Sequence, residues 1–315
     1  MKQRLVTGSI LVVGLVLLIL SRLLTPVIFD FGIGAFAVLG AVEVARVFER
    51  SGKHSNIIMA SIYPAVLYLG VCLAIAKGWS WIGYVAWFVV SLAIYFGLII
   101  LVSYILINKT KEEIATKKLE ISLHKYALFK AINTIIVCVY PTVLFFALIL
   151  INHMASFKIV AENELLLNSN FDFMLIIMIF AVQILTDSLA MLVGSKFKGP
   201  KLCPVVSPKK TISGAIGGML GGVVGALVIY GFFMLNGPFK AMYTTLELNV
   251  WYFIFFGFVG AFMCQCGDIF ASLLKRRARV KDYGTVFPGH GGIMDRMDGL
   301  IFVASFALIF LFIVA

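Results

Sequence analysis

Long apolar runs dominate this chain of 315 residues, of which 62% are hydrophobic and only 13% are charged. A helix needs about 20 apolar residues to cross the hydrocarbon core of a bilayer. We place runs of about this length at 5–24, 27–48, 57–77, 80–107, 126–152, 172–195, 211–235, 250–274 and 297–315. The sequence therefore predicts an all-α, polytopic membrane protein with about nine transmembrane helices.

The basic residues predict the orientation of these helices, because short cytoplasmic loops are enriched in Lys and Arg. With the N-terminus in the cytoplasm and the C-terminus outside, nearly all of the 26 Lys and Arg residues fall on the cytoplasmic side. The exceptions are Arg22, Lys77, Lys158 and Lys240. We therefore expect a multi-pass protein of the cell membrane. The net charge of +11 reflects this asymmetry, and we expect no nucleic-acid partner.

The chain has too little polar sequence for a separate soluble domain, so we expect one integral membrane unit. Its transmembrane helices 1–4 and a cytoplasmic loop occupy 1–125, and helices 5–9 occupy 126–315. The loop at 109–125 is either a solvated basic loop or an interfacial helix on the anionic leaflet. The five cysteines lack metal-ligand spacing and are expected to be packing residues. We expect the three histidines outside the charged segment to be surface residues: His54, His124 and His153.

A charged segment at 266–300 interrupts the apolar pattern of the C-terminal part. Its Asp268 and the more distant Asp187 each lie within a predicted span, roughly 10–14 Å from the cytoplasmic end of the helix. Acids within a span are costly and usually functional, although two unrelated buried acids are the alternative. Asp295 and Asp298 share one face at the start of the last span. The four carboxylates predict a hard-oxygen site for one or two Mg²⁺ ions.

Two basic elements accompany these acids. The run KRRARVK at 275–281 is typical of a stop-transfer cluster, but that role does not explain the PGHGG turn at 288–292. A glycine-rich turn lets backbone amides approach an anion, and His290 can donate to a phosphate. The second element, SPKKT at 207–211, is expected to be a basic loop before a helix whose N-terminus favours anions. Thr211 or Ser213 can cap that helix. The glycines of that helix recur at four-residue spacing, which favours tight helix packing.

These residues resemble the signature of the phosphatidate cytidylyltransferases (CDP-diacylglycerol synthases). The matching positions are Ser272, Lys275, Arg276, Lys281, Asp282, Pro288, His290, Gly291, Gly292, Asp295, Arg296 and Asp298. SPKKT with the glycine-rich helix, and Asp187 with Gly194 and Lys196, resemble two further blocks of the family. The resemblance is good over 187–299. The N-terminal half matches only in its hydrophobic layout and in Glu43.

The resemblance implies transfer of CMP from CTP to phosphatidic acid on the cytoplasmic face, giving CDP-diacylglycerol and pyrophosphate. It also implies a homodimer among membrane lipids and Mg²⁺ held by Asp268 and Asp295, with a monovalent cation such as K⁺ as a further candidate. The catalytic candidates are Asp268, Asp295, Asp298, Lys275, Arg296 and His290. The substrate-binding candidates are Ser207, Lys209, Lys210, Thr211, Arg276, Lys281, Asp282, Gly291, Gly292 and Asp187.

Two alternatives remain open. One is a related CTP-dependent enzyme that acts on another lipid, as in CDP-archaeol synthesis or polyprenol phosphorylation. The other is an ion-coupled transporter that uses Asp187 and Asp268 as a relay. The sequence shows no inverted repeat, and its acids gather with cations on one side rather than at the midplane, which disfavours a transporter.

Overall fold

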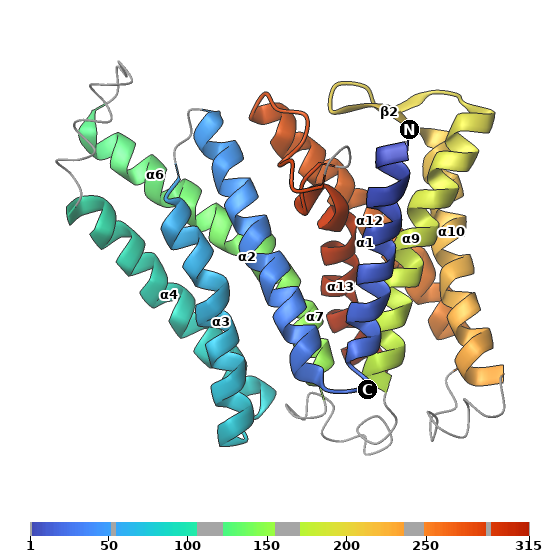
Figure 1. Ribbon diagram of the computed structural model, residues 1–315, viewed down its shortest axis with the longest axis horizontal. Coiled ribbons are helices and arrows are strands. Elements are labelled where there is room, and N and C mark those ends of the chain that lie inside the picture. The colour runs from blue at the N-terminus through green and yellow to red at the C-terminus, as the bar shows by residue number, and fades with distance from the viewer. Residues whose placement is uncertain are drawn as a thin grey trace.

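The computed structural model describes residues 2–51, 55–105, 122–154, 171–235, 249–287 and 291–314. Figure 1 shows long helices that run roughly side by side, with the start of α1 and the end of α13 at opposite ends of the bundle. The helices are α1 (Lys2–Ser21), α2 (Pro26–Arg50), α3 (Ile57–Lys77), α4 (Trp81–Ile105), α6 (Leu123–Val137), α7 (Leu144–Asn152), α9 (Phe171–Phe197), α10 (Ile212–Tyr230), α12 (Val250–Arg277) and α13 (Met294–Val314). Short π-helical turns, η1 (Cys138–Val143) and η2 (Gly231–Leu235), follow α6 and α10.

The predicted all-α, membrane-spanning architecture is confirmed. In the described part of the chain, seven helical segments are long and apolar enough to cross a membrane. They are Pro26–Arg50, Ile57–Lys77, Ile82–Ser103, His124–Asn152, Phe171–Phe197, Ile212–Leu235 and Val250–Arg277. Helices α1 and α13 occupy the predicted first and last spans. The orientation of the termini stays a prediction.

The fifth predicted span is not one continuous helix. At η1, Tyr140 adopts extended backbone angles (φ −109°, ψ 119°) just before Pro141. Proline has no N–H to donate to the helix and disfavours a helical conformation in the residue before it. The span therefore consists of α6 and α7 with a break between them.

The segment that contains SPKKT forms a strand, where only a loop was expected. Strands β1 (Lys201–Cys203) and β2 (Ser207–Thr211) make an antiparallel hairpin, with Lys201 opposite Thr211. The hairpin lies at the end of the bundle where α1 begins (Figure 1). Thr211 caps α10, because its hydroxyl accepts the Gly214 N–H at 3.1 Å. The sequence predicted a cap from either Thr211 or Ser213, and the structure assigns it to Thr211.

A seam of glycines brings α10 against both α9 and α12. A Cβ on Gly221 would lie 2.4 Å from the carbonyl oxygen of Leu185 in α9. A Cβ on Gly222 would lie 2.5 Å from the carbonyl oxygen of Gly257 in α12. The predicted tight helix packing is therefore confirmed, and no larger residue fits at these two positions without moving a helix backbone.

A buried polar network joins α2, α7 and α9 at the opposite end of the bundle from the hairpin (Figure 1). Asp30 accepts a hydrogen bond from Asn152 Nδ2 at 2.8 Å and lies 2.6 Å from His153 Nε2. Arg22 donates to Asn152 Oδ1 at 2.5 Å and pairs with Asp172. The expectation of a surface residue at His153 is therefore wrong, because the end of α7 packs against a buried acid that lies far away in sequence. His124 is exposed as expected, and His54 lies outside the described residues.

Replacement of Asp30 by Ala should lower the midpoint of thermal unfolding in detergent by roughly 5–10 °C. The change removes a buried carboxylate and leaves Asn152 and His153 without their shared partner, at a cost of about 3–5 kcal/mol. A matched control is Glu49→Ala, which removes an exposed acid of the same helix. Equal unfolding midpoints for the two variants would show that the network does not stabilise the fold.

Candidate functional site

The predicted acids and lysines meet at two adjoining cavities near the hairpin. The first has a volume of about 420 Å³ and lies among α9, β2, α10 and α12. The second, of about 310 Å³, extends towards the start of α13. The two walls share Asp187, Lys210 and Asp268. Both cavities therefore belong to one site, which we call the acid–lysine site.

The first cavity brings together residues from three segments that are distant in sequence. Lys210 of β2 donates to Asp268 Oδ2 of α12 at 3.0 Å. Asp187 of α9 accepts a hydrogen bond from Gln183 at 3.1 Å, and the Cys264 thiol lies 3.8 Å from its other oxygen. Lys209 also lines this cavity and makes no ion pair within the described residues. Asp187 and Asp268 therefore line one cavity, rather than being two unrelated buried acids.

The second cavity adds the acids of α13. Asp295, Arg296 and Asp298 line it together with Ser272. The Asp298 carboxylate is buried and accepts the N–H of the following Gly299 at 3.1 Å. All four predicted carboxylates therefore contribute to the acid–lysine site.

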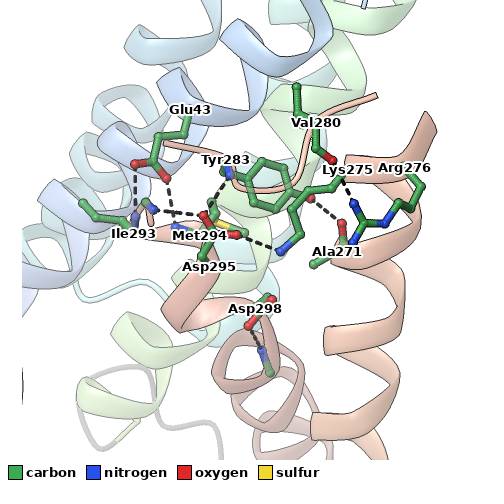
Figure 2. A network of polar contacts seen from close by, with 12 residues as sticks. Glu43, Ala271, Lys275, Arg276, Val280, Tyr283, Ile293, Met294, Asp295 and Asp298 are labelled. Carbon is green, nitrogen blue, oxygen red and sulfur yellow. Dashed lines mark hydrogen bonds and ion pairs between the residues drawn. The ribbon is translucent and has the colours of Figure 1, made fainter. Parts of the chain in front are cut away.

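Asp295 also holds the turn that precedes α13, as Figure 2 shows. Its Oδ1 accepts a hydrogen bond from Lys275 Nζ at 2.7 Å. Its Oδ2 accepts the backbone N–H of Tyr283 at 2.8 Å and that of Gly292 at 2.9 Å. A carboxylate can accept about four hydrogen bonds. Asp295 already accepts three from within the protein, which leaves about one acceptor position open. Asp268 Oδ1, in contrast, accepts no hydrogen bond from the described residues.

Tyr283 fixes the other side of this turn. Its ring lies under the Lys275 ammonium, with 5.1 Å between the nitrogen and the ring centroid. Burial raises the pKa of the Tyr283 hydroxyl, which stays protonated and donates to the Ala271 carbonyl of α12 at 3.1 Å. The turn is thus attached to both α12 and α13.

Glu43 of α2 is a buried residue to which no role was assigned from the sequence (Figure 2). Its two oxygens accept the backbone N–H groups of Ile293 and Met294, each at 3.0 Å. These amides are the unpaired donors at the start of α13, where a negative charge is favoured. A Cβ on Gly284 or Gly292 would lie 2.4 Å from Glu43 Oε1. The sequence offers two signals for Glu43, its match to the family pattern and its place as an acid inside an apolar run, but neither identifies its partner.

Several other candidates lie outside both cavity walls. Arg276 donates to the Val206 carbonyl at 3.2 Å and so ties the hairpin to α12. Gly291 has φ +88°, which favours glycine, and pairs with Phe287 across a short bridge. Ser207, Lys281, Asp282 and Gly292 line neither cavity. His290 and Pro288 lie outside the described residues.

The residues of the site suit a divalent cation that arrives with a phosphate ligand. Within the described residues, no three Asp, Glu, His or Cys side chains form a ready metal site. Asp268 and Asp295 each bond a lysine, while the free oxygen of Asp268 and the carboxylate of Asp298 offer the ligands that Mg²⁺ prefers. Mg²⁺ usually binds through one or two carboxylates, substrate phosphates and waters. The donor chemistry therefore fits, without a preformed cage.

Comparison with known proteins agrees with this arrangement. The family model described as "Cytidylyltransferase family" matches residues 2–314. The chain belongs to the cytidylyltransferase family.

Similar proteins are found in several bacteria. A protein of Rickettsia felis named phosphatidate cytidylyltransferase is 38% identical over 130 residues, which are 41% of this chain and 55% of that protein. A protein of Brucella abortus with the same name is 37% identical over 158 residues, or 50% of this chain and 53% of that protein. The chain spans about half the length of the curated relatives it matches.

Proposed function

We propose that the protein is a phosphatidate cytidylyltransferase, which transfers CMP from CTP to phosphatidic acid and releases pyrophosphate. The observation that carries the proposal is the shared wall of the two cavities, where Asp187, Lys210 and Asp268 meet. Two adjoining cavities give room for two phosphate-bearing substrates beside one set of charged groups. The names of the similar proteins support this choice of reaction.

The reaction is an in-line displacement at the α-phosphorus of CTP. An oxygen of the lipid phosphate forms the new P–O bond, while the bond from the α-phosphorus to the bridging oxygen breaks and pyrophosphate leaves. The nucleophile is already an anion, so it requires no strong general base. The main obstacle is repulsion between two anions, which positioning and fixed positive charge overcome. The cations available for this are Lys209, Lys210, Lys275 and Arg296.

A divalent ion would add to this neutralisation. Asp268 and Asp295 are the proposed ligands, Asp295 through the acceptor position that its three hydrogen bonds leave open. A bound Mg²⁺ would supply further positive charge to the phosphates. A lysine already bonds each of the two carboxylates in the structure. In this proposal the substrate phosphates would attract the lysines and would also offer oxygen ligands to the ion.

We also propose that the site faces the cytoplasm, where the CTP is, and that the enzyme acts in the cell membrane as a homodimer. The cytoplasmic orientation is supported by the distribution of the 26 Lys and Arg residues. The homodimer is supported by the resemblance to the family alone. Chemical crosslinking in native membranes tests the dimer, and a labelling reagent that cannot cross the membrane, directed at exposed Lys209, tests the orientation.

The reaction itself is tested with purified protein in detergent, CTP labelled in its cytidine, phosphatidate and Mg²⁺. The expected result is lipid-soluble label that depends on phosphatidate, is abolished by excess EDTA and returns with added Mg²⁺. Diacylglycerol or a polyprenol in place of phosphatidate should give none. Full activity in EDTA would remove the metal from the proposal. Absence of label with any phosphorylated lipid would contradict the proposed reaction.

A further inference from the structure

A third cavity lies on the other side of the turn that Asp295 holds. It has a volume of about 420 Å³ and lies between the C-terminal end of α2 and residues 280–286. Its wall includes Arg46 and Arg50 of α2, and Lys281. It shares no lining residue with the two cavities of the acid–lysine site. Two signature residues, Lys281 and Asp282, therefore lie away from the proposed chemistry.

The charge of this cavity suits an anion. Arg46, Arg50 and Lys281 are exposed, and within the described residues none of their side chains forms an ion pair or a hydrogen bond, although the charge of Arg46 acts on nearby Glu43. Of the two acids in the wall, Glu43 is already engaged by the amides at the start of α13. Three cations thus remain beside one exposed acid, Asp282. A concave surface lined in this way concentrates anions.

The surroundings of the cavity suit an amphipathic anion. Arg50 is the last residue of α2, a helix long and apolar enough to span a membrane, so the cations lie where lipid headgroups begin. Val286 in the same wall is 50% exposed, and the neighbouring Thr285 also lines the cavity. An apolar side chain beside arginines at a membrane end fits a phospholipid better than a hydrated soluble ion.

We propose that this cavity binds the phosphate of an anionic phospholipid at a site separate from the site of CMP transfer. The occupant would lie against Tyr283 and Gly284, which also line the wall. Tyr283 donates its N–H to Asp295, and Gly284 packs against Glu43. A bound lipid would therefore contact Tyr283, which in turn bonds Asp295 of the acid–lysine site. It would stabilise the turn that contains Tyr283.

The test measures lipid binding without nucleotide, by native mass spectrometry of the detergent-purified protein. Phosphatidylglycerol, which lacks a phosphate monoester, is titrated against phosphatidylcholine. Wild-type protein should retain phosphatidylglycerol selectively. The double variant Arg46→Gln/Arg50→Gln should bind it at least about tenfold more weakly, since two charge-assisted contacts are lost. The matched control is Arg277→Gln/Arg279→Gln, which removes two exposed cations from the same end and should bind like wild type.

Three results would overturn the proposal. They are equal affinity of wild type and the Arg46/Arg50 variant, no preference over phosphatidylcholine, and displacement of the lipid by equimolar pyrophosphate. The last would assign the cavity to a soluble phosphate. Thermal unfolding of each variant confirms that the protein compared is folded. Because no turnover is measured, a failure of the proposed reaction would leave this result unaffected.

Discussion

Replacement of Asp268 by Asn is expected to lower the rate of CMP transfer by roughly 10²–10³-fold, with little change in the stability of the protein. Asp268 lines both cavities of the acid–lysine site and is bonded to Lys210. Asn keeps the shape of the side chain but removes its negative charge. The side chain would then no longer bind the proposed metal–phosphate complex through a carboxylate. A loss of several kcal/mol of charge stabilisation corresponds to this change in rate. The measurement is the initial rate of lipid labelling from CTP.

Two comparisons make this result specific. Glu49→Gln neutralises an exposed acid near the same end of the bundle and should retain the wild-type rate. In the Asp268→Asn variant, more Mg²⁺ should be needed for half-maximal rate. Wild-type turnover with an unchanged Mg²⁺ requirement would exclude Asp268 from the metal site. An equal loss of rate in the Glu49→Gln variant would indicate a general effect of charge.

Replacement of Glu43 by Ala is expected to lower both thermal stability and the rate of CMP transfer. The change leaves the buried N–H groups of Ile293 and Met294 without acceptors, at a cost of about 1–3 kcal/mol each. It also removes a negative charge from the start of α13. The turn that Asp295 holds loses its attachment to α2, so kcat should fall more than KM for CTP rises.

A graded series separates this role from simple destabilisation. Glu43→Gln keeps one acceptor oxygen and should lie between wild type and Glu43→Ala in both unfolding midpoint and kcat. Gly292→Ala should resemble Glu43→Ala, because its Cβ would approach Glu43 Oε1 to 2.4 Å. Gly231→Ala adds the same methyl group where no atom lies within 4 Å of the new Cβ and serves as the control. A Glu43→Ala protein with wild-type kcat would show that Glu43 does not position the site.

The bundle and the depth of its acids were predictable because both follow from the thickness of a bilayer. A run of about 20 apolar residues determines a span, and the rise of a helix places Asp187 and Asp268 at one level. The meeting of these two residues in one cavity follows that prediction closely. A cap on α10 from Thr211 or Ser213 was also predictable, because capping depends on neighbouring residues alone, and Thr211 is the residue that provides it.

The contacts between distant segments were not predictable from one sequence. Glu43 bonds amides 250 residues further along the chain, and Lys210 bonds an acid 58 residues away. No local pattern encodes such pairs, because they depend on which helices pack together. The same reason explains the error at His153, whose partner Asp30 belongs to another helix. Strand β2 was missed because a short strand that contains Pro and two Lys carries no alternating apolar pattern.

The glycine seam of α10 limits how far the helices around the acid–lysine site can move relative to one another. Asp187 belongs to α9 and Asp268 to α12, while Lys210 belongs to strand β2, which leads directly into α10. The three charged groups are therefore held by the three helices that the glycines join and by the strand attached to one of them. At Gly221 and Gly222 the backbone of α10 packs directly against the backbones of α9 and α12. No flexible side chain lies between them that could adjust if one helix moved. Sliding of one helix past another would separate Lys210 from Asp268. The alignment of these charges thus depends on two positions that have no side chain and line neither cavity of the site.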